Sequence, residues 1–153
     1  MLLGLAVAAG NLRQLAPNGI SIAGRWPTSS SSAEDAYKMM AKPGDPAFIS
    51  LAEVIDIQNK KTALLVDARS VEEFSAGRIP GSRNLPYYEM EAKQAVALAG
   101  VKPDAPLVIY CEGVGCELSF FLGRELQAQG YSNIRIFYGG YPEWQQAGLS
   151  IEN

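Results

Sequence analysis

The sequence predicts an α/β domain with a mostly parallel sheet that helices cover on both faces. The runs "TALLVDAR" and "APLVIYC" are continuously apolar, which is typical of strands buried on both faces. Stretches with helical spacing alternate with such strands, as expected for a parallel sheet. Because ligands of these sheets bind beyond the carboxyl ends of the strands, the residues that follow each strand are the first candidates for a site.

Strand and helix patterns alternate from about residue 48 to the end of the chain. Strands are predicted at "FIS", "TALLVDAR", "SRNLPY", "APLVIYC" and "IRIFYG". Helices are predicted at "LAEVIDIQNKK", "SVEEFSAGRI", "EMEAKQAVALAGV", "CELSFFLGRELQAQG" and "YPEWQQAG". Residues 48–153 are therefore expected to form one folded domain.

Local signals predict where several helices begin and end. Ser50 precedes the first helix and Glu53 follows three residues later, which predicts a capping box. The helix after "SRNLPY" is expected to end at Gly100 and the one after Cys111 at Gly130, since glycine closes helices readily. The apolar stripe of the helix after Cys111 is expected to consist of Leu118, Phe121, Leu122 and Leu126.

Residues 1–47 are predicted to form an apolar segment followed by a Pro/Gly/Ser-rich linker. "MLLGLAVAAG" is far shorter than the roughly 20 apolar residues that span a bilayer, and the first basic residue is Arg13. It can be the end of a membrane helix, an atypical signal, or a terminal helix packed on the domain; the first is preferred because small apolar residues dominate. After the linker, Ser32 can cap a short helix. A periplasmic or membrane-tethered domain is slightly favoured over a cytoplasmic one.

The composition argues against several classes of function. The net charge of −3 and the lack of a basic cluster argue against nucleic-acid binding and against a polybasic membrane patch. The chain has no histidine, which removes the usual general base and the usual metal ligand. Two cysteines alone cannot form a four-ligand zinc site. Catalysis would then rest on a thiolate, carboxylates, backbone amides or a bound cofactor; we predict no cofactor and no metal.

Cys111 is the main candidate for a nucleophile. It ends an apolar strand and is followed by "EGVGCE", a loop that leads into a helix. Gly113 and Gly115 allow positive φ values, so backbone N–H groups and the helix N-terminus can face the Cys111 sulfur. Such an environment lowers the pKa of a thiol and can hold the charge of a persulfide. The alternative is a buried apolar cysteine without a chemical role.

Three separated motifs resemble those of rhodanese-like sulfurtransferases. "LLVDARSVEEFSAGRIPGSRNLP" is similar to the first signature of that family, the segment around Cys111 to its active-site loop, and "GGYPEWQQAG" to its closing signature. The resemblance runs from about Phe48 to Ile151 and implies a rhodanese-like fold, with a five-stranded parallel sheet flanked by helices. It also implies a cysteine that accepts sulfane sulfur as a persulfide and passes it to a thiol or another nucleophile.

The resemblance assigns roles to residues of the first two motifs. Cys111 corresponds to the persulfide-carrying cysteine. The loop that cradles the persulfide consists of Glu112, Gly113, Val114, Gly115, Cys116 and Glu117. Asp67 and Arg69 correspond to the Asp-x-Arg that follows the second strand, and we expect them to form an internal ion pair or a hydrogen-bonded turn.

The chain departs from the family pattern inside the loop. Many members carry basic residues at the second and sixth positions counted with the persulfide-carrying cysteine as the first, where this chain has Glu112 and Cys116. Glutamates raise the pKa of a nearby thiol and repel a dianion, which predicts poor use of thiosulfate. The loop also lacks the arginine with which a phosphatase clamps an oxyanion. Arg78 stands where many members have histidine, so that position supplies no base.

Cys116 has two interpretations that the sequence leaves open. As a resolving thiol it would attack a persulfide or sulfenate on Cys111, close a disulfide and release the cargo. As a structural residue it would pack against the sheet.

The sequence therefore predicts a sulfurtransferase that carries sulfur on Cys111, with a small-molecule or protein sulfur donor and a thiol acceptor as partners. One alternative is a thiol–disulfide redox module that uses Cys111 and Cys116. Another is a catalytically silent domain that binds or senses, with the N-terminus as a tether to a membrane or a membrane-protein partner.

Overall fold

The computed structural model describes residues 41–153. The expectations for the apolar start, the serine-rich stretch and the short helix from Ser32 concern residues that lie outside this range. Within residues 41–153, no helix is long and apolar enough to cross a bilayer.

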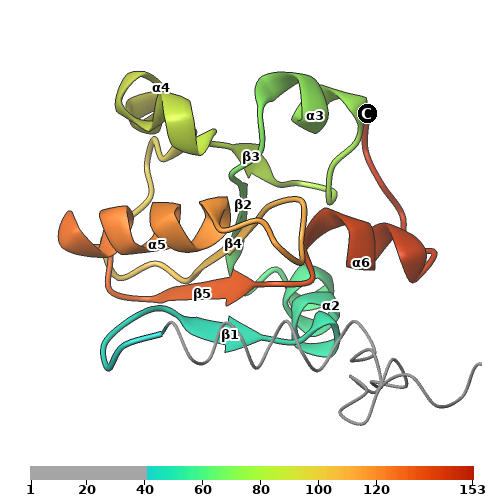
Figure 1. Ribbon diagram of the computed structural model, residues 1–153, viewed down its shortest axis with the longest axis horizontal. Helices are drawn as coiled ribbons and strands as arrows, with labels where there is room; N and C mark the ends of the chain where they lie inside the picture. Colours follow the sequence, from blue (N-terminus) through green and yellow to red (C-terminus); the bar gives the residue numbers. More distant parts are fainter. Residues whose placement is uncertain (1–40) are drawn as a thin grey trace, which may run out of the picture.

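Five strands of the described part form one sheet, in the order β1-β5-β4-β2-β3. They are β1 (Ala47–Ile49), β2 (Leu64–Asp67), β3 (Arg83–Asn84), β4 (Leu107–Tyr110) and β5 (Ile134–Phe137). Every pairing is parallel, which confirms the predicted fold class. The carboxyl ends of the strands therefore meet at one edge, towards which the arrowheads of β1 and β5 point in Figure 1.

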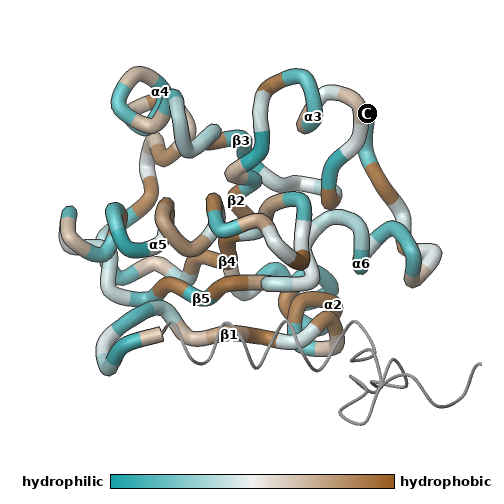
Figure 2. Tube along the Cα trace, viewed as in Figure 1, coloured by the Kyte–Doolittle hydropathy of each residue, from teal (hydrophilic) through white to brown (hydrophobic). Residues whose placement is uncertain are grey.

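β4 lies at the centre of the sheet, between β5 and β2. All four of its residues are buried, as the unbroken apolar run predicts, and the neighbouring strands are also coloured as hydrophobic in Figure 2. The chain leaves β4 at Cys111, so this residue occupies the middle of the edge where the carboxyl ends meet.

Helices cover both faces of the sheet and divide the core into two clusters. They are α2 (Leu51–Lys60), α3 (Val71–Ala76), α4 (Met90–Ala97), α5 (Leu118–Ala128) and α6 (Gly140–Gln146), with a 3-10 turn, η1 (Tyr87–Glu89), before α4. α4 and α5 contribute Ala97, Phe120 and Leu126 to the cluster on one face. α2 and α6 contribute Val54 and Trp144 to the cluster on the other face.

The predicted start of α2 is confirmed. The Ser50 hydroxyl accepts a hydrogen bond from the Glu53 amide, and the Glu53 carboxylate accepts one from the Ser50 amide at 2.8 Å. α3 starts in the same way, with Ser70 and Glu73. In both cases residues three positions apart satisfy amides that the helix itself cannot.

The end of α4 differs from the prediction. The helix stops at Ala97, and Gly100 lies in the following turn with a φ of 75°. Arg83 donates hydrogen bonds to the carbonyl oxygens of Ala97 and Ala99, both at 3.1 Å. This tertiary contact satisfies carbonyls that another turn of helix would have used.

The buried face of α5 also differs from the predicted stripe. Leu122 and Leu126 are buried as expected, whereas Leu118 and Phe121 are only half-buried. Ser119, Phe120 and Gly123 are buried instead. A methyl group at Gly123 would lie 3.0 Å from the Ile136 Cδ1 atom, so the helix approaches β5 closely at this glycine. That approach turns the Phe120 side of the helix towards the sheet. Gly130 follows the last turn with a φ of 99°, as predicted for a glycine that closes a helix.

Candidate active site around Cys111

Cys111 lies at the carboxyl end of β4 with its side chain inside the protein. It is 1% exposed and belongs to the core cluster that β4 and α5 share. Its carbonyl oxygen accepts a hydrogen bond of 2.9 Å from the Tyr141 amide, at the start of α6. The position of Cys111 is thus set by the sheet on one side and by α6 on the other.

The loop after Cys111 turns at its two glycines. Gly113 has a φ of 89° and Gly115 a φ of 87°, which confirms the predicted left-handed conformation. The loop also packs tightly on the residues before α6. A side chain on Gly113 would collide with the Gly139 carbonyl oxygen, and one on Gly140 would collide with the Cys111 carbonyl oxygen. Gly113 and Gly140 therefore allow two backbone segments to touch.

The two cysteines of the chain meet inside this loop, as reduced thiols. The Cys111 Sγ atom donates a hydrogen bond to the Cys116 carbonyl oxygen at 3.2 Å and lies 3.5 Å from the Ser119 Oγ atom. The interaction with the Cys116 side chain raises the pKa of Cys111, with burial adding to the effect. Contacts with Ser119 act in the opposite direction.

The pKa of Cys116 is shifted in the opposite direction to that of Cys111. The interaction with the Cys111 side chain lowers the pKa of Cys116 to about 6, against burial, and hydrogen bonds from the backbones of Leu118 and Glu112 lower it further. We expected the loop amides to lower the pKa of Cys111. Instead, the amides of Glu112 in the loop and Leu118 at the start of α5 lower the pKa of Cys116. Cys116 is only half-buried, so ionising its thiol costs less desolvation free energy than ionising that of Cys111.

Asp67 and Arg69 form the expected ion pair, at the end of β2 beside Cys111. Arg69 Nη2 lies 2.6 Å from Asp67 Oδ2, and the two side chains are 2% and 0% exposed. The same guanidinium reaches the loop, where its Nη1 atom lies 2.9 Å from Glu112 Oε1. It also stacks on the Tyr141 ring, 4.2 Å from the centroid. Buried hydrogen bonds and this pairing raise the pKa of Arg69 above its ordinary value.

Two neighbours of the loop were not predicted from the sequence. Ser119 contacts the Cys111 sulfur, and the Tyr138 hydroxyl accepts a hydrogen bond of 3.2 Å from the Gly115 amide. The contact of Ser119 could have been predicted from the sequence. Ser119 lies on the predicted buried side of its helix, and a buried hydroxyl group needs a nearby hydrogen-bond partner. Arg78, which stands where many family members have histidine, pairs with Glu152 at 3.4 Å.

The described residues offer no group of three histidine, cysteine, aspartate or glutamate side chains that could hold a metal ion. Two thiols lie at this edge of the sheet. One thiol is buried at a strand end, and the other is half-buried in a loop of backbone amides.

Comparisons with known proteins identify the family of this domain. The model of the "Rhodanese-like domain" family matches residues 50–147. The chain is 35% identical over 107 residues to the human thiosulfate:glutathione sulfurtransferase, covering 63% of this chain and 90% of that protein. The solved structure of a human single domain sulfurtransferase, 33% identical, superposes with a TM-score of 0.55 over 65% of this chain and 95% of that one.

A longer relative shares the same region. The HTH-type transcriptional regulator Rv0324 of Mycobacterium tuberculosis is 32% identical over 117 residues, which cover 76% of this chain. The chain spans only 49% of the length of that regulator. The relatives named sulfurtransferases support sulfurtransferase activity for the shared domain. With a family match across residues 50–147 and the fold of that family, this chain belongs to the rhodanese-like domain family.

Proposed function

We propose that this rhodanese-like domain carries sulfane sulfur as a persulfide on Cys111 and passes it to a thiol acceptor. The observation that carries the proposal is the Cys111 sulfur at the base of the glycine loop, hydrogen-bonded to the Cys116 carbonyl oxygen at 3.2 Å. The whole chain lacks histidine, the usual base for activating a thiol. We therefore assign the role of the base that takes the Cys111 proton to Cys116, whose pKa is lowered to about 6.

In the first step, the Cys111 sulfur attacks the outer sulfur of a donor persulfide, R–S–S⁻. A new S–S bond forms on Cys111 as the S–S bond of the donor breaks, and the donor leaves as the thiolate RS⁻. The proton of Cys111 moves to the Cys116 thiolate. The enzyme then holds a persulfide anion on Cys111 and a neutral thiol on Cys116.

In the second step, an acceptor thiolate attacks the outer sulfur of the Cys111 persulfide. The acceptor leaves as a persulfide anion, and Cys111 takes its proton back from Cys116. Backbone amides of the loop from Glu112 to Glu117 would stabilise the charge of the persulfide. The Ser119 amide, just beyond the loop, already contacts the Cys111 sulfur.

We further propose that thiosulfate is a poor donor. Glu112 and Glu117 lie in the loop, and the cation that pairs with Glu112 is Arg69, only 2% exposed. The guanidinium is engaged by Asp67, Glu112 and the Gly77 carbonyl oxygen, so it offers little to a dianion. A persulfide of lower charge, on a small molecule or a protein, suits this loop better.

A thiol–disulfide module is the second candidate, because the Cys111 sulfur lies 3.2 Å from the Cys116 carbonyl oxygen and each thiol shifts the pKa of the other. In this case the Cys116 sulfur attacks the inner sulfur of the Cys111 persulfide while its proton passes to the outer sulfur. The persulfide S–S bond breaks, a Cys111–Cys116 disulfide forms, and the outer sulfur leaves as HS⁻. The same step would make Cys116 the resolving thiol of the transferase.

The test is intact mass spectrometry of the reduced full chain after incubation with thiosulfate or with glutathione persulfide. We expect a gain of one sulfur atom from the persulfide, much less from thiosulfate, with Cys111→Ala unable to gain sulfur and Cys116→Ala still able. A loss of two hydrogens without added sulfur favours the redox module. No gain with either donor, together with ordinary alkylation of Cys111, would instead indicate a silent binding domain.

A further inference from the structure

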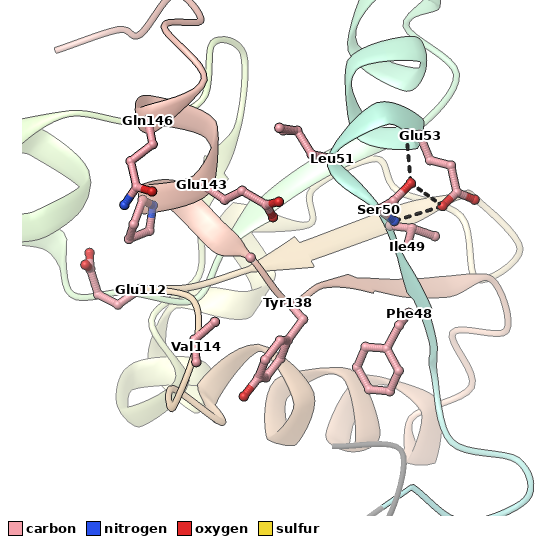
Figure 3. Close-up of a pocket in the computed structure, with 12 residues that line it drawn as sticks. Phe48, Ile49, Ser50, Leu51, Glu53, Glu112, Val114, Tyr138, Glu143 and Gln146 are labelled. Carbon is pink, nitrogen blue, oxygen red and sulfur yellow. Dashed lines mark hydrogen bonds between the residues drawn. The ribbon is translucent and has the colours of Figure 1, made fainter. Parts of the chain in front are cut away.

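A cavity of about 610 Å³ opens beside the Cys111 loop, at the carboxyl edge of the sheet. Its walls come from the ends of β1 and β5, the first turns of α2 and α6, and the loop residues Glu112 and Val114. Figure 3 shows Glu112 and Glu143 near α6, with Tyr138 and Phe48 beneath them. Since Gly113 packs on Gly139, the loop and the cavity wall are in direct contact.

The charge of the cavity wall has a single sign. Among the described residues that line it, three are glutamates and none is lysine or arginine. Glu53 is occupied by the capping box of α2. Glu112 is paired with Arg69, yet its side chain remains 46% exposed. The cavity therefore keeps two carboxylates, those of Glu112 and Glu143, that a ligand can reach.

The Glu143 carboxylate is placed against the backbone beside the loop. Its Oε2 atom occupies the position that a side chain on Gly139 would take. No described residue makes a recorded hydrogen bond or ion pair with this carboxylate, and burial raises the pKa of Glu143. A carboxylate that has no partner among the described residues attracts a positively charged group of a ligand.

The rest of the wall is apolar and aromatic. Leu51, Val114 and Pro142 offer aliphatic surface, and the rings of Phe48 and Tyr138 lie at the base of the cavity. Such a surface suits a short methylene chain, and an aromatic ring can also contact a cation. With no cationic side chain on the wall, an anionic ligand would find only repulsion.

We propose that this cavity binds the ammonium group of a small aminothiol, which serves as the sulfur acceptor. The inference rests on the proposed sulfur transfer from Cys111. The ammonium group lies between Glu112 and Glu143, and the methylene chain lies along Val114 and Pro142. Cys111 does not itself line the cavity, so the transfer needs its outer sulfur to extend towards the loop wall. The acceptor thiolate attacks that outer sulfur as its S–S bond to Cys111 breaks. The acceptor then leaves as an aminopersulfide. The cavity thus selects the acceptor by charge.

The test compares three acceptors of similar size on sulfur-loaded protein at neutral pH. Cysteamine carries an ammonium group, 2-mercaptoethanol is neutral and 3-mercaptopropionate carries a carboxylate. The second-order rate of sulfur transfer is measured for each. Ratios between the wild type and variants cancel the different intrinsic reactivities of the three thiols.

Glu143→Gln keeps the shape of the side chain and removes its charge. In this variant we expect the ratio of the cysteamine rate to the 3-mercaptopropionate rate to fall about fivefold, which is the effect of one charge–charge contact in a solvent-exposed site. The loading of Cys111 with sulfur should be unchanged. Gly139→Ala keeps the charge but displaces the carboxylate, so we expect a drop in the same direction. Glu125→Gln, on the exposed side of α5, makes the same change in net charge and should leave the ratio unaltered.

A binding measurement separates this inference from the proposed function. S-methylcysteamine cannot accept sulfur, and its binding to the full chain can be followed by NMR beside the neutral 2-(methylthio)ethanol. We expect the cationic analogue to bind more tightly, and Glu143→Gln to abolish the difference. Equal binding of the two analogues, or an unchanged rate ratio in Glu143→Gln, would overturn the inference even if Cys111 transfers sulfur. A failure of Cys111 to take up sulfur, with the cationic analogue still bound, would overturn only the proposed function.

Discussion

Two thiols that shift each other's pKa strongly titrate as a unit. In this chain the unit is asymmetric, because Cys111 is buried against β4 and α5 while Cys116 is half-buried among loop amides. This asymmetry raises the pKa of Cys111 and lowers that of Cys116. A chain without histidine thus has a base of low pKa beside its candidate nucleophile.

This asymmetry predicts how the alkylation rate depends on pH. Since the pKa of Cys116 is lowered to about 6, its thiolate is present above that pH and is lost below it. The rate of Cys116 alkylation by iodoacetamide, measured by mass spectrometry, should therefore have its midpoint near pH 6. In Cys111→Ala the main cause of the shift is gone, and the midpoint should move towards that of an ordinary thiol, about 8.5.

Ser119→Ala is the matched control for the alkylation experiment. Ser119 contacts the Cys111 sulfur and does not contribute to the lowered pKa of Cys116. This variant should keep a midpoint near that of the wild type. A wild-type midpoint close to 8.5 would show that the two thiols titrate independently, and the proton transfer proposed for them would then lose its support.

At the scale of elements, α6 helps to hold the loop in place although it is only seven residues long. Its first turn donates the Tyr141 amide to the Cys111 carbonyl oxygen, and Gly140 lies against the backbone of Cys111 and Gly113. The guanidinium of Arg69 stacks on Tyr141 from the β2 side. Three segments that are distant in the sequence therefore determine where the Cys111 sulfur lies.

Gly140→Ala tests this contact between elements. Gly140 has a φ of 61°, and an added methyl group would lie 2.5 Å from the Gly113 nitrogen atom, so backbone must move. We expect the variant to lose roughly 3 kcal/mol or more of unfolding free energy in urea, and to load less sulfur. Gly148→Ala is the control, since its φ is 70° but no atom lies within 4 Å of the added methyl group. It should lose only about 1–2 kcal/mol. Equal losses of unfolding free energy in the two variants would mean that the close backbone contact at Gly140 does not contribute to stability.

At the scale of the whole molecule, the sheet separates two apolar clusters. Ile109 and Ile136 belong to the cluster under α4 and α5 and are paired across β4 and β5. Ile57 of α2 belongs to the cluster on the opposite face. Side chains on opposite faces share no partners, so their contributions to stability should be independent.

Conservative truncations test that independence. Ile57→Val and Ile136→Val should each cost about 0.5–1.5 kcal/mol of unfolding free energy, and their double variant the sum within about 0.5 kcal/mol. Ile109→Val combined with Ile136→Val should depart further from additivity, because these side chains are neighbours in one cluster. Urea unfolding with an unchanged slope provides the measurement. Coupling across the sheet as large as that within one cluster would contradict the division into two cores.

The sequence by itself determined the features that depend on neighbours along the chain. The buried strands β2 and β4, the capping boxes at Ser50 and Ser70, and the positive φ values of Gly113 and Gly115 were all predictable. Each follows from hydrophobic spacing, side chains three residues apart, or the freedom of a residue without Cβ. The same local logic placed Cys111 at a strand end before a helix.

Only the tertiary structure decided how charge is arranged around that cysteine. Arg69 binds Glu112, which lies 43 residues further along the sequence. The Glu143 carboxylate lies against Gly139, next to the Cys111 loop. The direction in which the pKa of each thiol shifts depends on burial and on the amides of Glu112 and Leu118. These properties arise because electrostatic energies depend on distances and solvation in space, which spacing along the chain does not specify.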